Sequence, residues 1–292
     1  MKTVELKKAF SELNIWKRGG ERAPHKPLLL LYSLGRVDRN ERRLISYEET
    51  KRDLRELLTE FGPLRPPMTN HPFVRLQNDG IWEVIGQKVL DSSVSWGDRI
   101  LIENKSYGGF TEEVYSTLIK DKDLLREIAG IILERNFPDT IHTDILEAIG
   151  LNLETIVKPR DANFRERILQ AYEYSCAVCG FNVRLGHTLF AVEAAHIKWH
   201  QAGGPDVENN GIALCTLHHK LFDRGVFAIN PAMELKVAER AHGTQGFEEW
   251  LMRYHGNTIR GPQRTQYQPA ELYLNWHIRE VFRGTARESF NY

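Results

Sequence analysis

All three cysteines of the 292-residue chain lie in one short region, within two pairs of potential metal ligands. Cys176 and Cys179 form one pair, and Cys215 and His218 form the other, each with a spacer of two residues. Such a spacer lets both side chains of a pair reach one ion, and four thiolate and imidazole ligands suit tetrahedral zinc. Four protein ligands leave no position open for water, so the spacing predicts a structural zinc site. A disulfide would leave the third cysteine unpaired, and chance spacing of buried cysteines is the other alternative.

Three further polar residues lie between and beside these pairs: His196, Asn210 and His219. Their order, within a zinc-binding segment, resembles that of the HNH (ββα-metal) nucleases. The resemblance covers about residues 163–242, and the segment His219-Lys220-Leu221-Phe222-Asp223-Arg224-Gly225 strengthens it. It implies a metal-dependent endonuclease that hydrolyses DNA.

The resemblance implies a role for each of these three residues. The neutral imidazole of His196 would take a proton from the water that attacks phosphorus. The amide of Asn210 would hold that imidazole or the loop around it. Adjacent helical residues point about 100° apart, so His218 can face zinc while His219 faces the substrate. His219 would bind a catalytic divalent ion, Mn²⁺, Mg²⁺ or a similar ion, which stabilises charge on the phosphate and on the leaving oxygen.

Glu193 is a second candidate ligand for the catalytic ion. In the HNH family an acid often stands directly before the general base, but this chain has Ala195 there and its acid three residues before His196. One ion therefore suits the sequence better than two. For Asp223, considered as a single residue, we expect a structural role rather than a catalytic one.

A second group of motifs lies in the N-terminal half of the chain. Residues 22–31, which begin Arg22-Ala23-Pro24-His25, resemble part of the sulfur-binding domain of McrA-like type IV restriction endonucleases. So do residues 71–76, which begin His71-Pro72, with Asp79-Gly80-Ile81-Trp82 after them. The resemblance covers about residues 1–155. It implies recognition of phosphorothioated DNA, in which sulfur replaces a non-bridging phosphate oxygen.

The resemblance also implies where the sulfur would bind. Sulfur is larger, more polarisable and more weakly hydrated than oxygen, so a shallow apolar cup gains dispersion contact with it. Pro72 and His71 would line the cup, although the family can have an aromatic residue in place of this histidine. Arg22 and His25 would supply positive charge around the modified phosphate. The other candidates are Arg75, Tyr107 and Gly108. The simpler alternative is that the prolines only shape a helix start and an extended link.

Composition limits the class of protein. Hydrophobic residues make up 41% of the chain, which suits globular domains. There is no apolar run of about 18 residues and no apolar stretch of a signal peptide at the N-terminus, so we expect a cytoplasmic protein. Net charge is zero, yet residues 1–77 hold 16 Lys and Arg against 10 Asp and Glu. A basic segment can attract phosphates even in a neutral protein, and a solvated charged surface is the alternative.

We expect an α+β protein whose two domains position these residues. Residues 1–155 should form a mainly helical recognition domain with a small sheet, and residues 156–292 a zinc-stapled ββα-metal domain with a helical tail. Apolar spacing predicts helices over residues 4–16, 47–61, 111–135 and 163–174, and another that starts at Pro27. Strands are expected over residues 188–193, 226–229 and 233–237, and a hairpin over residues 73–85 around Asn78-Asp79-Gly80.

Together these features predict a modification-dependent restriction endonuclease that binds double-stranded, phosphorothioated DNA. Because a double-strand cut needs two active sites or two encounters, we expect a homodimer. Two alternatives stay open. The modification could be methylated or hydroxymethylated cytosine, whose flipped base would need an aromatic pocket that Trp82 and Trp96 could supply. The chain could also be a zinc DNA-binding protein without catalysis, although zinc binding alone needs none of the His–Asn–His set.

Overall fold

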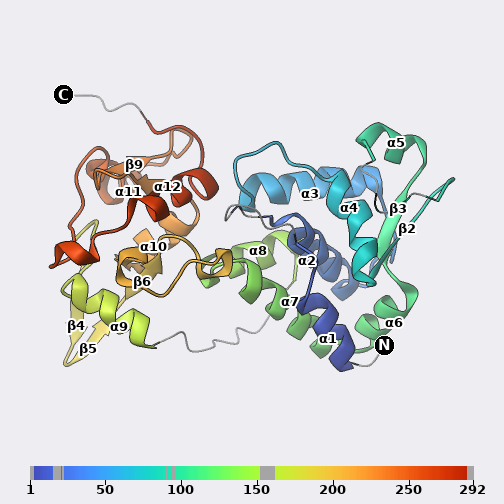
Figure 1. Ribbon diagram of the computed structural model, residues 1–292, viewed down its shortest axis with the longest axis horizontal. Helices are drawn as coiled ribbons and strands as arrows, with labels where there is room; N and C mark the ends of the chain where they lie inside the picture. Colours follow the sequence, from blue (N-terminus) through green and yellow to red (C-terminus); the bar gives the residue numbers. More distant parts are fainter. Residues whose placement is uncertain are drawn as a thin grey trace. The chain divides into compact units, whose positions relative to one another are not determined.

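The chain divides into two compact units, Met1–Ile156 and Val157–Tyr292 (Figure 1). The structure, a computed structural model, describes residues 3–15, 21, 23–89, 91, 93, 96–151 and 162–287. Each unit combines helices with short antiparallel strands, which confirms the α+β class. Within the described ranges, no helix has the length and apolar character needed to cross a membrane.

The first unit is built around one buried helix, α2 (His25–Asp38). Nine consecutive residues, 27–35, and Val37 are buried in it, and a helix that is apolar on all sides belongs inside a core. It packs against α3 (Tyr47–Phe61), α7 (Lys122–Asn136) and α8 (His142–Ile149) (Figure 1). The further α-helices in the described part of this unit are α1 (Thr3–Ser11), α4 (Asn70–Arg75), α5 (Asp98–Glu103) and α6 (Glu112–Lys120).

A three-stranded antiparallel sheet completes the first unit. Its strands are β1 (Ile45–Ser46), β2 (Trp82–Ile85) and β3 (Tyr107–Phe110), in the order β1-β3-β2. Trp82 pairs with Phe110 across the sheet, their ring centroids are 5.8 Å apart, and the ring of Phe73 from α4 lies 6.3 Å from Trp82. This aromatic cluster joins the sheet to the helical layer.

The hairpin expected over residues 73–85 is wrong. Phe73 and Val74 lie in helix α4, a 3-10 turn follows over Leu76–Asp79, and β2 pairs with β3 instead. A short apolar run suits a buried helix as well as a strand, so the local pattern did not distinguish them. Gly80, at φ 72°, ends the turn in the left-handed region that glycine adopts without strain.

Side-chain caps decide where several helices begin and end. The helix expected over residues 47–61 is confirmed, and the side chain of Ser46 caps it by accepting a hydrogen bond from the backbone of Glu49. The helix expected over residues 111–135 is two helices, because Asp121 leaves the helical conformation and its side chain accepts from Leu124 N to start α7. The first helix ends at Ser11, and the second starts at His25 rather than Pro27.

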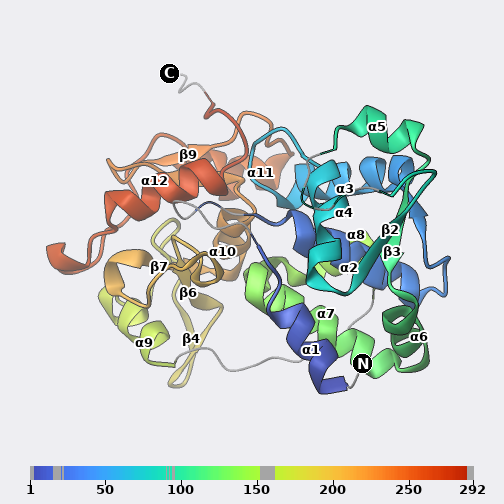
Figure 2. The ribbon, with the colours of Figure 1, turned by 45° about the vertical axis from the view of Figure 1, so that its right-hand side comes forward.

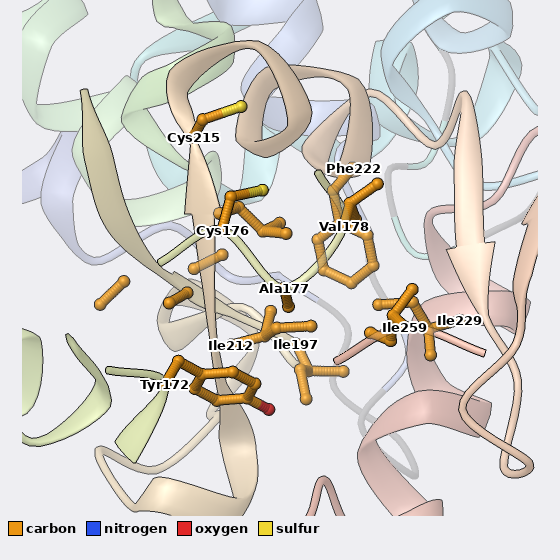
Figure 3. Packing of buried hydrophobic residues seen from close by; sticks show 14 of the residues in the cluster. Tyr172, Cys176, Ala177, Val178, Ile197, Ile212, Cys215, Phe222, Ile229 and Ile259 are labelled. Atoms are coloured by element: carbon orange, nitrogen blue, oxygen red, sulfur yellow. The ribbon is translucent and has the colours of Figure 1, made fainter. Parts of the chain in front are cut away.

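The second unit is organised around the pair β6 (Val192–His196) and β7 (Gly211–Cys215), followed directly by α10 (Thr216–Asp223). Helix α9 (Ala162–Ala171) packs against both strands, and Figure 2 shows α9, β6, β7 and α10 together. Figure 3 shows part of the core around Tyr172, Ala177 and Ile212. Among the described residues of this unit, the further strands and α-helices are β4 (Val183–Leu185), β5 (Thr188–Phe190), β8 (Phe227–Ile229), β9 (Leu235–Val237), α11 (Gln245–Trp250) and α12 (Glu271–Glu280).

Candidate active site and metal centre

The four predicted zinc ligands converge on one point. The ligand atoms of Cys176, Cys179, Cys215 and His218 all lie within 4.8 Å of one another. Cys179 Sγ is 3.9 Å from Cys215 Sγ, and Cys176 Sγ is 3.7 Å from His218 Nδ1. Metal–ligand bonds of about 2.3 Å to sulfur and about 2.0 Å to nitrogen put the ligands of a tetrahedral ion at comparable separations. The donor set and its geometry therefore fit a tetrahedral metal ion.

A turn, a strand and a helix position these four ligands. The first pair lies in the turn after α9, where Gly180 N donates to Cys176 O at 2.9 Å. Cys215 ends β7, and His218 lies in the first turn of α10. His218 Nε2 lies 2.8 Å from the carbonyl oxygen of Trp250 and donates to it, which leaves Nδ1 to face the thiols. A fixed tautomer of this kind is the usual arrangement around a metal-bound histidine.

His219 faces away from the zinc cluster, as the helical spacing predicts. Its Nδ1 is 2.7 Å from Glu193 Oε2 and its Nε2 is 3.2 Å from Asp223 Oδ2, and the side chain is buried. Burial by itself lowers the pKa of His219, but the carboxylates of Asp223 and Glu193 outweigh it and raise this pKa to about 9. The environment therefore favours positive charge at this position, whether from a proton or from a metal ion.

Strand geometry explains the displaced acid of this chain. Alternate residues of a strand share a face, so Glu193 lies on the same face of β6 as Ala195, whereas His196 lies on the other face. An acid three residues before His196 thus reaches the side that an acid directly before it would reach. The longer glutamate side chain then contacts His219 of α10.

A carboxylate and an aromatic ring contact the general-base candidate. His196 Nε2 lies 2.7 Å from Asp206 Oδ1, and the imidazole stacks on the ring of Phe164 with centroids 4.1 Å apart and planes 12° apart. Its strand partner is Gly211, where an added Cβ would lie 2.2 Å from Ile168 Cδ1 and 3.0 Å from Phe164 Cζ. Glycine at this position therefore lets the ring that supports His196 approach the sheet.

Asp206 is a site residue that the sequence did not single out. It follows Gly203-Gly204-Pro205 in the loop between β6 and β7, and no fixed spacing links a loop acid to a strand histidine. Its position after that glycine and proline turn was the available signal. A carboxylate on one imidazole nitrogen orients the ring and stabilises its protonated form.

Asn210 forms hydrogen bonds to the loop between β6 and β7. Its side chain is fully buried, its Oδ1 accepts from Lys198 N at 2.9 Å, and its Nδ2 donates to the carbonyls of Lys198 at 3.0 Å and Pro205 at 2.9 Å. Of the two roles expected for this amide, these contacts match the one in the loop. The contact expected with the imidazole is made by Asp206 instead.

In the first unit, α2 and α4 bring together two of the candidate DNA contacts, His25 of α2 and His71 of α4. Burial, followed by the charges of Arg65 and His71, lowers the pKa of His25 to about 4. His25 is therefore neutral at pH 7 and does not supply the positive charge expected of it. Arg65, which no sequence motif singled out, brings a positive charge to this place and forms an ion pair with Glu21 at 3.2 Å. Arg22 lies outside the described residues.

The remaining candidates lie on α4 and β3. His71 and Pro72 belong to the first turn of α4 rather than to an extended link, and Pro72 is buried. Burial of His71 lowers the pKa of this histidine, and the positive charge of Arg75 lowers it further. Arg75 itself is exposed. Tyr107 is exposed on β3.

Gly108 is buried in the sheet. An added Cβ there would lie 2.7 Å from the ring of Phe73 and 3.1 Å from that of Trp82. Packing inside the unit is therefore enough to require glycine at this position.

Comparison with known proteins covers both units. A family model described as "ScoMcrA-like, DNA sulfur-binding domain" matches residues 3–154, more than half of the chain. This chain belongs to the ScoMcrA-like DNA sulfur-binding domain family. A second model, "HNH endonuclease", matches residues 176–230, which include all four zinc-ligand candidates and the His196, Asn210 and His219 positions. The protein thus joins a DNA sulfur-binding domain to an HNH nuclease domain.

Solved structures similar to this chain include two sulfur-binding domains and a restriction endonuclease. The sulfur-binding domain of SprMcrA, complexed with phosphorothioated DNA, is 22% identical over 52% of this chain and 95% of its own, with a TM-score of 0.46. The corresponding domain of ScoMcrA, also complexed with phosphorothioated DNA, is 20% identical over 50% of this chain and 94% of its own (TM-score 0.45). The modification-dependent restriction endonuclease TagI is 24% identical over 45% of this chain and 41% of its own (TM-score 0.30). No curated protein sequence matches the chain.

Proposed function

We propose that this protein is a modification-dependent restriction endonuclease that binds phosphorothioated double-stranded DNA and hydrolyses its phosphodiester bonds. Residues 1–155 would bind the modified DNA, and residues 156–292 would cut it. The observation that carries the proposal is the union in one chain of a DNA sulfur-binding domain and an HNH domain with a convergent site. Neither half alone would make cleavage depend on the modification.

Catalysis would begin with proton transfer to His196. Asp206 fixes the tautomer of the imidazole and stacking on Phe164 fixes its plane, so the ring is oriented to accept a proton from the attacking water. Glu193 and His219 would hold a divalent ion such as Mn²⁺ or Mg²⁺, which supplies electrostatic stabilisation of the phosphate and of the leaving oxygen when bound. Asp223, buried behind His219, would orient that ligand.

The Cys176, Cys179, Cys215 and His218 cluster would hold Zn²⁺ in a structural role. All four positions of a tetrahedral ion are taken by protein, so this ion would stabilise the fold rather than activate water. The reducing cytoplasm, where thiols stay available to a metal, is the compartment that suits such a site.

The first unit would recognise sulfur through the surface where α2 and α4 meet. The contact atoms there would come from His71, Pro72 and the neutral His25 and would carry little charge. Such atoms suit a polarisable, weakly hydrated sulfur. Arg65 and Arg75 would balance the negative charge of the phosphate, together with Arg22. Tyr107 and Gly108 stay as candidate DNA contacts on β3.

A homodimer is the proposed active assembly. Each chain carries one His196–His219 site, and a double-strand break needs two hydrolyses on opposite strands. Two copies on one duplex would supply both within one encounter.

The decisive experiment compares two plasmids that are identical except for phosphorothioation, each incubated with the protein and Mn²⁺. Selective cutting of the modified plasmid is expected. Equal cutting would contradict the sulfur-binding role, and cutting of neither would contradict the nuclease role. His196→Ala is the matched control, and a folded His196→Ala protein that still cuts at the full rate would refute the proposed general base.

Of the two tryptophans considered for a flipped methylated or hydroxymethylated cytosine, Trp82 lies in the core of the first unit. Only 2% of its surface is exposed, and its ring is enclosed by Phe73 and Phe110. A base could not stack on it without opening the core. A third plasmid bearing methylated cytosine, included in the same assay, is expected to stay uncut.

A further inference from the structure

A segment beyond the matched HNH region carries positive charge without any acidic residue. Residues 250–270, termed here the arginine strap, contain Arg253, Arg260 and Arg264 and neither Asp nor Glu. The whole chain has equal numbers of acidic and basic residues, so a stretch of 21 residues with charge of one sign departs from its average. Such a stretch is where a polyanion would bind.

The three guanidinium groups face solvent and form no ion pair with a described carboxylate. All three arginines are exposed. Other arginines of the same unit are engaged, as Arg167 is with Glu208 at 3.0 Å and Arg279 with Glu280 at 3.0 Å. The charges of the strap are therefore available to an external partner.

The strap is fixed to the core rather than loosely attached. Ile259 is buried in the cluster that includes Ala177 and Ile229 (Figure 3). Arg260 N donates to Ala177 O, between the two cysteines of the first zinc pair, and Gln263 N donates to Ala171 O at the end of α9. The positions from which the arginines project are thus set before any ligand binds, which lowers the entropy lost on binding.

The same segment connects the zinc cluster to the catalytic loop. At one end the Trp250 carbonyl accepts from zinc-ligand candidate His218, and at the other Ala270 N donates to Asn209 O at 2.9 Å. Asn209 precedes the Asn210 that braces the loop of Asp206. A duplex held by the strap would therefore lie along the domain that carries His196.

Aromatic rings accompany the charges. The Arg253 guanidinium lies 5.5 Å from the Tyr254 ring centroid, the Arg264 guanidinium lies 5.9 Å from that of Tyr267, and Trp250 is 45% exposed. Stacking on rings restricts the arginine side chains while leaving their N–H groups to donate. Guanidinium groups with this restriction suit bidentate contacts to phosphate oxygens.

We infer that the arginine strap binds the DNA phosphate backbone and seats the duplex on the nuclease unit independently of the modification. This inference rests on the proposed nuclease function and adds a second DNA contact to it. Contacts to phosphate carry no sequence information, so the strap would position the duplex while the sulfur-binding domain selects it.

The test measures binding of an unmodified duplex by the full-length protein at several salt concentrations, without Mg²⁺ or Mn²⁺. Replacing the three arginines by alanine should make the slope of log affinity against log salt shallower by about 3, at about 0.9 per phosphate contact. Replacing them by lysine should keep most of the slope. Arg240→Ala, an exposed arginine of the same unit outside the strap, should leave the slope unchanged beside Arg260→Ala, which should reduce it by about 1.

An unchanged slope in the folded triple-alanine protein would overturn the inference. An equal change in Arg240→Ala would overturn it as well, because it would indicate diffuse charge rather than a site. The plasmid assay tests the proposed function separately. If the wild-type protein cuts neither plasmid, the proposed nuclease activity is contradicted. The salt dependence of binding tests the arginine strap whatever the plasmid assay shows.

Discussion

At the scale of single residues, activity should depend on the pairing of His196 with Asp206. Asp206→Asn keeps the shape of the side chain but removes the charge 2.7 Å from the imidazole. We expect kcat to fall by about 10- to 100-fold, less than the roughly 10²- to 10⁴-fold supplied by a general base itself. The acidic limb of the pH–rate profile should move to lower pH, because an imidazole without its carboxylate is harder to protonate.

Steady-state cleavage of phosphorothioated DNA across pH measures both effects. Glu208→Gln is the matched control, since it removes an acid of the same loop that pairs with Arg167 rather than with the imidazole. An Asp206→Asn protein with a lower rate but an unshifted pH profile would show that the aspartate only supports the loop.

At the scale of elements, the first unit depends on close contact between β3 and α4. Gly108→Ala would place a methyl group 2.7 Å from the Phe73 ring, and both that ring and Trp82 are buried in the aromatic cluster. We expect the free energy of unfolding of this unit to fall by about 1–3 kcal/mol, the usual range for overpacking.

Chemical denaturation of Gly108→Ala and Gly130→Ala measures the difference. Gly130 lies within α7, and an added Cβ there meets nothing within 4 Å, so its replacement should stabilise by roughly 0.5–1 kcal/mol. If Gly108→Ala kept full stability but lost DNA binding, the residue would serve DNA contact rather than packing.

At the scale of the whole molecule, the two units should respond differently to loss of metal. The four zinc-ligand candidates all lie in the second unit, and metal binding contributes directly to the folding energy of a small metal-stapled domain. A strong chelator, or Cys179→Ser, should lower the melting temperature of the second unit and leave that of the first unchanged.

Calorimetry with and without chelator should resolve this as one transition that moves and one that stays. Binding of phosphorothioated DNA should survive chelation, while cleavage is lost. A chelator that leaves both transitions in place, on protein whose metal content has been shown to fall, would rule out a structural ion.

The sequence by itself determined the features that depend on local spacing. A spacer of two residues brings Cys176 and Cys179 to one point, and the helical turn of about 100° per residue separates His218 from His219. Both relations hold within a single turn or helix, so no long-range contact was needed to predict them. The helix over residues 47–61 followed in the same way from its apolar spacing.

Only the tertiary structure decided the contacts that cross between elements. The pairing of β2 with β3, the Asp206 carboxylate on His196, the reach of Glu193 to His219 and the neutral state of His25 all join residues whose separation follows no repeat. Hydrophobic periodicity fixes which face of an element is buried but not which neighbour buries it. Packing chose those neighbours, and with them the charge and orientation of each residue in the site.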